Sequence, residues 1–416
     1  MAVAQLSDNG KVVIIGGGPG GTACALALQR LSAQMGRQVQ ITLLEGKQFT
    51  NERHYNQCVG VLSPPLPRLL EENLQVSFPY DLCRTEIKGY VLHCSGEDIL
   101  LDDSHDISYA MRRVQFDEYM LNMVKERGIE VQPARAVDLE FRYEGVTVYS
   151  EGAPIEAEVV VGAFGLDDGS LSMFSRSTHY QPPQVLNSLV TKYIPDENDA
   201  TEFGNYIHAF LPGNPHIEFG AITPKCSHLT INIAGIDVNR ELMDTFLTNP
   251  VVQEVLPALS GLRYGSDRDL VYFKGRFPVS LAQNYYGHRY VMVGDAAGLV
   301  RAFKGKGVSS AVQTGIRAAE AILEAGVTTQ AFHEHYRVAN QDIINDLPFG
   351  RFMRLITILM ARANLMGPVI RAAKKAPLLE SAILDAVSAR APYSEVLKKA
   401  LHPSSALAFL KALIHM

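Results

Sequence analysis

Two short apolar runs lie near the start of this chain, and the stretch between them spaces its apolar residues differently. Lys11–Ile15 and Gln38–Leu44 are rich in Val, Ile and Leu, which is typical of strands buried in a parallel sheet. Between them, Thr22–Leu31 places its apolar residues at helical spacing. The pattern predicts a strand, a turn, a helix and a second strand in succession.

Later parts of the chain follow other patterns. Three stretches favour strands, partly because apolar and polar residues alternate in them: Tyr206–Leu211, Ile217–Ile222 and Leu229–Ala234. Residues 346–416 favour helices, separated at Gly367-Pro368, Ala376-Pro377, Ala391-Pro392 and His402-Pro403. We therefore expect an antiparallel sheet in the middle of the chain and a helical region at its end.

The turn after the first strand carries a glycine pattern that suits a dinucleotide. Gly16, Gly18 and Gly21 form Gly-x-Gly-x-x-Gly between strand and helix, which permits a tight turn and close approach of the backbone to a pyrophosphate. Glu45 ends the second strand, where an acid can hydrogen-bond a ribose diol. With no Arg nearby for a 2′-phosphate, this site excludes NADP but does not separate NAD from FAD.

A second strand-and-turn motif far downstream decides for FAD. The strand Tyr290–Val293 ends in Gly294 and Asp295, a loop containing Gly305 follows, and a helix is predicted from about Gly307. A plain NAD enzyme has no use for such a motif, whereas a flavin does. Asp295 can bind the ribityl chain, and the helix N-terminus can face the flavin ring where negative charge develops on reduction.

Composition and charge narrow the class of protein. The 416 residues are enough for two or three packed units, and the net charge of −6 gives no case for nucleic acid. The five cysteines have no paired spacing, so neither a disulfide framework nor a metal site is indicated. The first residues do not read as a secretory signal, and the longest apolar stretch is too short to span a bilayer. A cytoplasmic location is expected.

Residues 351–416 differ from the rest of the chain in charge. They contain ten Lys or Arg and three Asp or Glu, a net charge of +7. One interpretation is an amphipathic helix that contacts a membrane surface peripherally, since apolar residues such as Phe352, Leu355 and Leu359 alternate with arginines. The favoured interpretation is an ordinary helix that packs on the flavin-binding domain and screens its acidic surface.

Two further motifs carry a family resemblance. Arg113-Val-Gln-Phe116-Asp117 resembles an Arg-x-x-Phe-Asp motif, and the turn around Cys58 and Gly60 resembles a Cys-x-Gly turn beside a flavin ring. Together with the two glycine turns, these motifs occur along about residues 1–330 in the same order as in a known family. The chain resembles FAD-dependent oxidoreductases of the para-hydroxybenzoate hydroxylase fold, and most of all the geranylgeranyl reductase group.

The resemblance implies an architecture. The fold class is α/β, α+β overall, with a Rossmann-like FAD-binding domain of GR2 type, an inserted antiparallel-sheet substrate domain and a C-terminal helical region. The FAD-binding domain is expected at residues 1–90, 105–180 and 270–345, the substrate domain at 90–105 and 180–270, and the helical region at 346–416. Arg113 is expected to contact the flavin nucleotide.

The resemblance also implies an activity. We expect a FAD-dependent reductase that delivers hydride to a C=C bond of an apolar or prenylated substrate. Cys58 or Tyr55 would be the proton donor. The electron donor is either NAD(P)H or a ferredoxin-like protein. Phe164 stands where the family has an Asp linked to nicotinamide contacts, which weakens the expectation of ordinary NAD(P)H docking.

Two other functions remain open. The first is a flavin monooxygenase or halogenase on the same fold, although the halogenase Trp-x-Trp signature is impossible in a chain without Trp. The second is a flavin electron-transfer protein that works with a partner.

Overall fold

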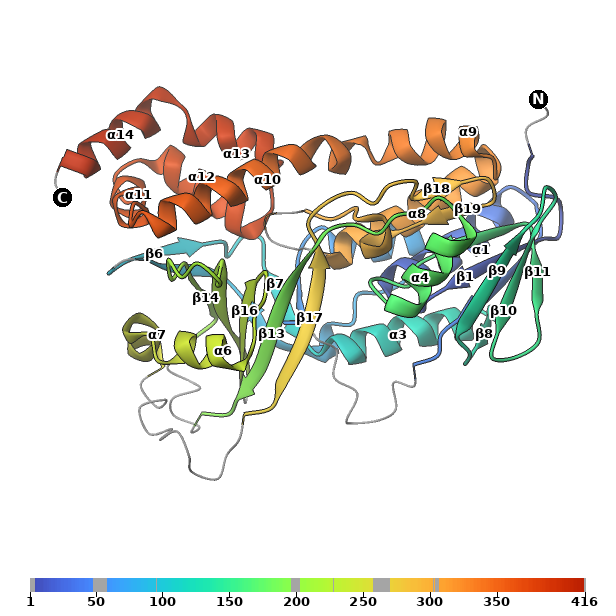
Figure 1. The fold of residues 1–416 in the computed structure, drawn as a ribbon, viewed down its shortest axis with the longest axis horizontal. Coiled ribbons are helices and arrows are strands. Elements are labelled where there is room, and N and C mark those ends of the chain that lie inside the picture. The colour runs from blue at the N-terminus through green and yellow to red at the C-terminus, as the bar shows by residue number, and fades with distance from the viewer. Residues whose placement is uncertain are drawn as a thin grey trace.

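The computed structural model describes residues 4–47, 58–94, 96–195, 203–226, 228–256, 270–301, 303 and 307–414. Its helices and strands form three regions: two sheet-containing regions lie side by side along the long axis, and a layer of C-terminal helices lies above the second of them (Figure 1). The predicted candidates Tyr55 and Gly305 fall outside the described residues.

A six-stranded sheet forms the centre of the first region. Its strands lie in the order β18-β19-β12-β1-β2-β8, with β1 parallel to both β2 and β12. Their bounds are β1 Gly10–Ile15, β2 Val39–Leu44, β8 Glu130–Gln132, β12 Val159–Gly162, β18 Tyr286–Gly287 and β19 Tyr290–Met292. Because Val12, Val13 and Ile14 of β1 are fully buried, this strand is the middle of the core.

Helices and two small sheets complete this region. The long helices α1 and α8 pack on each other beside the sheet (Figure 1). The helices are α1 Pro19–Gln34, α2 Leu66–Arg68, α3 Arg113–Glu126, α4 Asp168–Ser177, α8 Gly307–Glu324 and α9 Thr329–Ala331. One small sheet contains β9 Ala136–Phe141, β10 Val146–Ser150 and β11 Ile155–Ala157, and the other β3 Val61–Leu62, β4 Cys83–Ile87 and β7 Ser108–Met111.

The second region is a seven-stranded sheet, which we call the inserted sheet. Its order is β17-β13-β16-β15-β14-β5-β6, and every pair is antiparallel except β14 with β5. The strands are β5 Gly89–Cys94, β6 Glu97–Asp102, β13 Val185–Tyr193, β14 Tyr206–Phe210, β15 Phe219–Lys225, β16 His228–Gly235 and β17 Tyr272–Pro278. Since β17 belongs to this sheet, the domain boundary expected at residue 270 lies after Pro278.

The third region is helical and covers the β5–β6 side of the inserted sheet (Figure 1). Its helices are α10 Gln341–Arg362, α11 Met366–Ala373, α12 Pro377–Ser388, α13 Tyr393–Ala400 and α14 Pro403–Ile414. Ile370 of α11 and Leu379 of α12 belong to the same buried cluster as Leu92 of β5. The helical character expected for residues 346–416 is therefore present, with an apolar contact to the inserted sheet.

Many basic residues of the third region pair with acids of the inserted sheet. Arg371 and Lys374 lie 3.3 and 3.0 Å from Glu97. Arg354 lies 2.5 Å from Glu218, which directly precedes β15. The packing interpretation of residues 351–416 thus applies, but with a correction: these ion pairs join the helices to the inserted sheet, whereas we expected them to screen the FAD-binding domain. The acids concerned are distant in sequence, so charge counting could not identify them.

Among the described helices, none is by itself long and apolar enough to cross a membrane. Helices α10 and α11 meet the length and composition requirements together, but they are bent by 108° relative to each other.

Candidate functional site

The turn between β1 and α1 is restricted to glycine for steric reasons. Gly16 has φ +109°, and a Cβ there would lie 2.5 Å from the carbonyl oxygen of Ala163. A Cβ on Gly21 would lie 1.9 Å from the carbonyl oxygen of Gly16. Gly18 differs, because a Cβ there would meet nothing within 4 Å. Gly16 and Gly21 therefore shape the turn, while Gly18 faces open space at the N-terminus of α1.

Glu45 fastens this turn to the end of β2. Its carboxylate accepts hydrogen bonds from the backbone N–H of Gly17 at 2.8 Å and of Lys47 at 2.7 Å. A carboxylate has further lone pairs, so Glu45 can still accept hydrogen bonds from a ribose diol. The structure places Glu45 beside the glycine turn, which is the arrangement its role requires.

The downstream turn is also built around glycine. Gly294 and Gly298 have φ +58° and +69°, which favours glycine at both positions. A Cβ on Gly307, the first residue of α8, would lie 3.1 Å from Asp295 Oδ1. The carboxyl of Asp295 therefore lies against the N-terminus of α8, where the helix dipole favours negative charge.

The side chain of Asp295 is only partly exposed. Burial raises the pKa of its carboxyl from 3.8 to about 6, and the nearby Arg113 opposes that rise. A bound polyol can donate hydrogen bonds to this carboxyl, because part of it still reaches the surface. This is the chemistry expected of a ribityl-binding carboxylate.

Close packing of α1 on α8 brings the two turns side by side. A Cβ on Gly315 would lie 2.3 Å from the carbonyl oxygen of Gly20. A Cβ on Gly20 would in turn lie 3.1 Å from Val293 Cγ2 and 3.3 Å from the carbonyl oxygen of Ala311. The helix backbones can approach this closely only because both positions are glycine. Turns separated by more than 250 residues thus line one site.

Arg113 links the downstream turn to the predicted catalytic turn. It forms an ion pair with Asp117 at 2.9 Å, and both side chains are largely buried. Its Nη1 lies 3.9 Å from Cys58 Sγ, and the backbone N–H of Gly60 lies 3.3 Å from the same sulfur. Arg113 also interacts electrostatically with Asp295. The structure therefore brings Cys58, Arg113 and Asp295 together, and the Cys58 side of this group is exposed.

The inserted sheet contributes Lys225, a site residue that the sequence analysis missed. Lys225 is only 4% exposed, and its Nζ donates to the carbonyl oxygen of Met111 at 3.1 Å. A Cβ on Gly60 would lie 3.0 Å from the same Nζ, so the ammonium group lies beside the Cys58 turn. Burial lowers the pKa of Lys225 to about 8, while Cys58 opposes that change. A lysine at the end of an alternating strand was the available signal.

Phe164 does not take over the polar role of the acid that it replaces. Its ring stacks on Phe174 of α4 with centroids 5.2 Å apart. The side chain packs partly against the core cluster of the first region. This position therefore offers no carboxylate to a nicotinamide.

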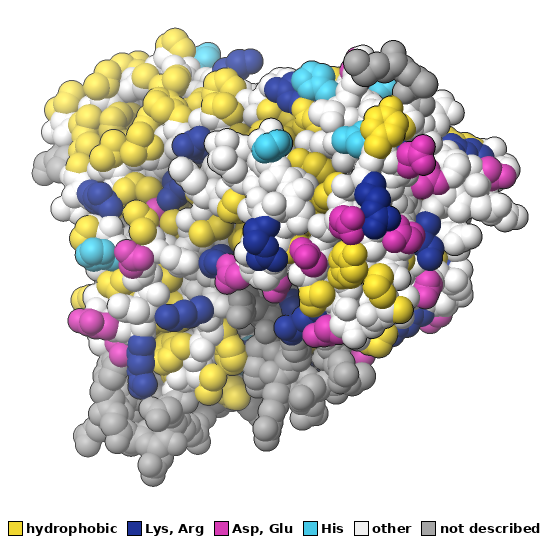
Figure 2. Space-filling model, turned by 45° about the vertical axis from the view of Figure 1, so that its right-hand side comes forward, with side chains coloured by type: hydrophobic (Ala, Val, Ile, Leu, Met, Phe, Trp, Pro, Cys, Tyr) yellow, Lys and Arg dark blue, Asp and Glu magenta, His cyan; other side chains and the backbone are white. Residues whose placement is uncertain are grey.

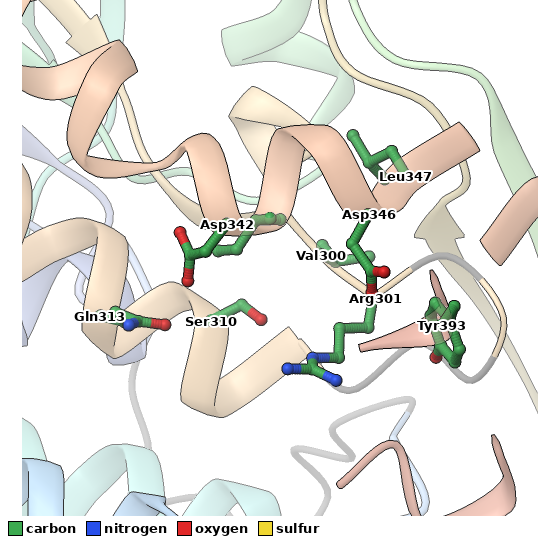
Figure 3. Close-up of a pocket in the computed structure, with 9 residues that line it drawn as sticks. Val300, Arg301, Ser310, Gln313, Asp342, Asp346, Leu347 and Tyr393 are labelled. Carbon is green, nitrogen blue, oxygen red and sulfur yellow. The ribbon is translucent and has the colours of Figure 1, made fainter. Parts of the chain in front are cut away.

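The loop after Asp295 is anchored to the C-terminal helices. Arg301 Nη1 donates to the carbonyl oxygen of Ala391 at 2.7 Å, and the rings of Phe303 and Tyr393 lie 5.8 Å apart. Arg301 also lines a cavity of about 40 Å³ between α8 and α10, into which two aspartates of α10 point (Figure 3). That volume suits water and is too small for an organic substrate.

The described residues fit a FAD. Two glycine turns leave room for a dinucleotide backbone, Glu45 and Asp295 offer carboxylates at the two ends, and helix N-termini face both turns. The fit follows from the backbone, because Gly16 and Gly21 allow the tight turn and Gly18 leaves open space at the N-terminus of α1.

The chain is similar to known proteins over most of its length. The chain is 22% identical to a digeranylgeranylglycerophospholipid reductase of Methanococcus vannielii over 347 residues, which covers 80% of this chain and 81% of that protein. No protein-family model matches the sequence.

Solved structures share the fold. A geranylgeranyl bacteriochlorophyll reductase-like protein from Thermoplasma acidophilum has a TM-score of 0.68 at 17% identity, covering 94% of this chain and 98% of that one. A flavin-dependent brominase has a TM-score of 0.68 at 16% identity, covering 98% of both chains. These comparisons confirm the predicted fold and the predicted similarity to the geranylgeranyl reductase group. They also agree with FAD as cofactor and with a FAD-dependent oxidoreductase.

Proposed function

We propose that this chain is a FAD-dependent reductase that reduces a C=C bond of an apolar, isoprenoid-like substrate. The observation that carries the proposal is that Arg113, whose Nη1 lies 3.9 Å from Cys58 Sγ, also interacts electrostatically with Asp295, which supports a thiol next to a site fitted for FAD. The similarity to a reductase over four-fifths of the chain supports the same reaction class.

The chain's own residues have separate tasks in this function. When bound and reduced by the electron donor, the flavin would supply the hydride that adds to one carbon of the double bond. The glycine turns and Glu45 would hold the nucleotide, Asp295 would bind the ribityl end, and the N-terminus of α8 would stabilise negative charge on the cofactor. Arg113 holds the Cys58 turn in place through its contact with Sγ.

Proton delivery falls to the Cys58 turn. Cys58 Sγ is exposed and carries the proton that the second alkene carbon needs. Tyr55 stays the alternative donor predicted from the sequence. The electron donor is NAD(P)H or a ferredoxin-like protein, and the aromatic stack of Phe164 favours the protein donor.

We further propose that the C-terminal helices contact a membrane from the cytoplasmic side. Phe352, Leu355 and Leu359 form one exposed stripe of α10, and Leu407, Leu410 and Ile414 form another at the same spacing on α14. Figure 2 shows hydrophobic side chains gathered over this part of the surface. Arg351, Lys375, Lys398 and Lys411 are basic residues of this region that form no ion pair within the described chain. Apolar stripes with free basic groups suit an anionic lipid surface.

A monooxygenase or halogenase remains the second candidate, because the fold is equally similar to a flavin-dependent brominase. Product analysis separates the two reactions. The holoenzyme is reduced with dithionite, mixed with geranylgeraniol or its phosphate in air, and the products are weighed by mass spectrometry. A reductase adds hydrogen to the substrate. Products that contain added oxygen or halogen, with no hydrogenated product, would contradict the proposal.

A further inference from the structure

The two faces of the inserted sheet differ in character. The register pairs Leu189 with Ile233 and Tyr193 with Leu229, and this face packs on the helix α6, Arg240–Leu247. Residues paired directly across an antiparallel sheet share a face. The intervening pairs therefore lie on the opposite face, and they include Lys192 with Thr230, Thr223 with Thr230 and Lys225 with His228, besides Val190 and Ala221, which both pair with Asn232. We call this the polar face.

Two buried atoms of the polar face lack a hydrogen-bond partner. Within the described chain, neither Thr230 Oγ1 nor His228 Nε2 has one, and Thr230 is only 2% exposed. Leaving a buried polar group unsatisfied destabilises the folded protein. Buried polar atoms of this kind in a folded protein are usually satisfied by a ligand or an ordered water.

The charge around these atoms is positive. Lys225, Lys192, Arg112 and Arg84 all lower the pKa of His228 to about 4, with burial as the larger cause. Lys225 uses a single hydrogen bond to Met111, although an ammonium group has three donors. It forms no ion pair with any residue that the structure describes. A buried ammonium without a carboxylate is stabilised by any anion that reaches it.

The polar face also borders the catalytic turn. Lys225 Nζ lies beside Gly60 and interacts electrostatically with Cys58. Lys225 is therefore the donor next to the thiol that we assign to proton transfer. Two neutral donors lie on the same face of the sheet as Lys225: the His228 imidazole, in the tautomer that carries the proton on Nε2, and the Thr230 hydroxyl.

We propose that Lys225, His228 and Thr230 form a subsite for an anionic oxygen group, a carboxylate or phosphate, carried by the apolar substrate. This assignment rests on the proposed function, since the substrate's double bond must lie near Cys58. Lys225 supplies the charge, and Thr230 and His228 supply neutral donors. The subsite fixes the anionic end of the substrate against the inserted sheet and so determines which double bond meets the flavin.

Ligand binding to the oxidised holoenzyme tests the subsite without turnover. The probes are geranylgeranyl phosphate, geranylgeranoic acid and geranylgeraniol, and the readout is the perturbation of the flavin absorbance. We expect one or both anions to bind about ten- to hundred-fold more tightly than the alcohol, because a charge-assisted hydrogen bond contributes about 1.5–3 kcal/mol. The phosphate and carboxylate probes distinguish the two anion classes.

Two variants locate the effect. Lys225→Met should remove the preference for anions and leave binding of the alcohol unchanged. Thr230→Val keeps the side-chain shape, so it should weaken anion binding while raising the melting temperature of the ligand-free protein. A hydroxyl that served only the fold would not give this opposite pair of shifts. Lys274→Met is the matched control, because Lys274 is exposed and pairs with Leu189 on the other face.

Each outcome is decisive. Equal affinities for anions and alcohol in the wild type, or a preference that survives both variants, would overturn the subsite. If anions bind preferentially but no alkene is reduced, the proposed function fails and the anion site stands. If the alkene is reduced with no preference for anions, only the subsite fails.

Discussion

The nucleotide turns and the polar face of the inserted sheet border one site, but the turns depend on backbone shape and the polar face depends on side chains. The turns are shaped by the absence of side chains, since a Cβ on Gly16 or Gly21 would collide with backbone oxygens. The polar face works through side chains such as Lys225 and Thr230, which are buried without full hydrogen bonding. The first part binds a cofactor by shape, whereas the second is fitted to recognise a particular chemical group.

This difference decides how each part tolerates change. A backbone-shaped turn fails abruptly when a methyl group is added, because backbone cannot move aside cheaply. A polar face loses affinity gradually and keeps the fold, because a buried polar group replaced by an isosteric apolar one does not strain its neighbours. Substitutions on the two sides should therefore separate folding, cofactor binding and turnover.

The largest effect is expected in the first turn. Gly21→Ala would place a methyl carbon 1.9 Å from the carbonyl oxygen of Gly16, so the turn must open. We expect loss of bound flavin and a destabilisation of about 3 kcal/mol or more, at the upper end of overpacking effects. The flavin absorbance of the purified protein measures the loss of flavin, and its melting temperature measures the destabilisation.

Gly18→Ala is the matched control for that change. Its Cβ meets nothing within 4 Å, so the melting temperature of the flavin-free protein should stay the same while FAD affinity falls. Unchanged FAD affinity in Gly18→Ala would mean that the open side of the turn does not face the nucleotide.

Cys58→Ser should produce the next largest effect. A hydroxyl is a far weaker acid than a thiol, and a positioned proton donor contributes about 10²–10⁴-fold to a rate. We expect turnover of an alkene substrate to slow by at least about tenfold, with flavin content and flavin reduction by dithionite intact.

Two comparisons make this result specific. Cys226→Ser is the control, because Cys226 is an exposed cysteine just after β15, and its backbone N–H donates to Thr85 Oγ1 of β4. Normal turnover in Cys58→Ser together with loss of turnover in Tyr55→Phe would transfer the proton-donor role to Tyr55.

Asp295→Asn tests the downstream turn through its pH dependence. The folded pKa of about 6 lies above the ordinary 3.8, so the stability this group contributes is present below about pH 4 and is lost as the pH rises through 6. Removing the charge should therefore raise the melting temperature of the flavin-free protein at pH 7 and leave it unchanged at pH 4. FAD affinity should fall about tenfold, because a charge-assisted hydrogen bond is lost. A stabilised variant with full FAD affinity would contradict the assigned role.

The smallest effect concerns the C-terminal helices. Phe352 and Leu359 are 50% and 53% exposed, so the double substitution to Ser should leave the melting temperature almost unchanged. Binding to vesicles of phosphatidylcholine and phosphatidylserine should fall about tenfold, as expected when two half-exposed apolar side chains are lost. Val137→Ser, at a 51% exposed position of β9, should bind vesicles like the wild type. Equal sedimentation of all three proteins with vesicles would remove the membrane proposal.

The contrast between turns and sheet also explains what the sequence could predict. The sequence could predict Gly16, Gly21 and Gly294, because backbone sterics demand glycine at fixed offsets from strand and helix. It could also predict Asp295, because this residue directly follows Gly294 in the same motif. Lys225 was not, since alternation in a strand does not say which face points toward the flavin. That face follows from its register with β16, and from the position of Met111, which is distant in sequence.

The C-terminal region gives the same lesson. Its helices could be predicted from local pattern, but their partners could not. Glu97, which pairs with Arg371, lies in β6, and Glu218, which pairs with Arg354, directly precedes β15, so both partners depend on a sheet assembled from distant segments. Local sequence patterns predict helices and strands, whereas the partners of charged side chains depend on the assembled fold.

An anaerobic half-reaction tests the central claim most directly. The holoenzyme is reduced with dithionite, freed of excess reductant, and mixed with geranylgeranyl phosphate while the flavin absorbance is followed. We predict that the flavin is reoxidised without oxygen and that a product appears carrying one added H₂ per bond reduced. A flavin that stays reduced until air is admitted, with no hydrogenated product from any probe, would contradict the account.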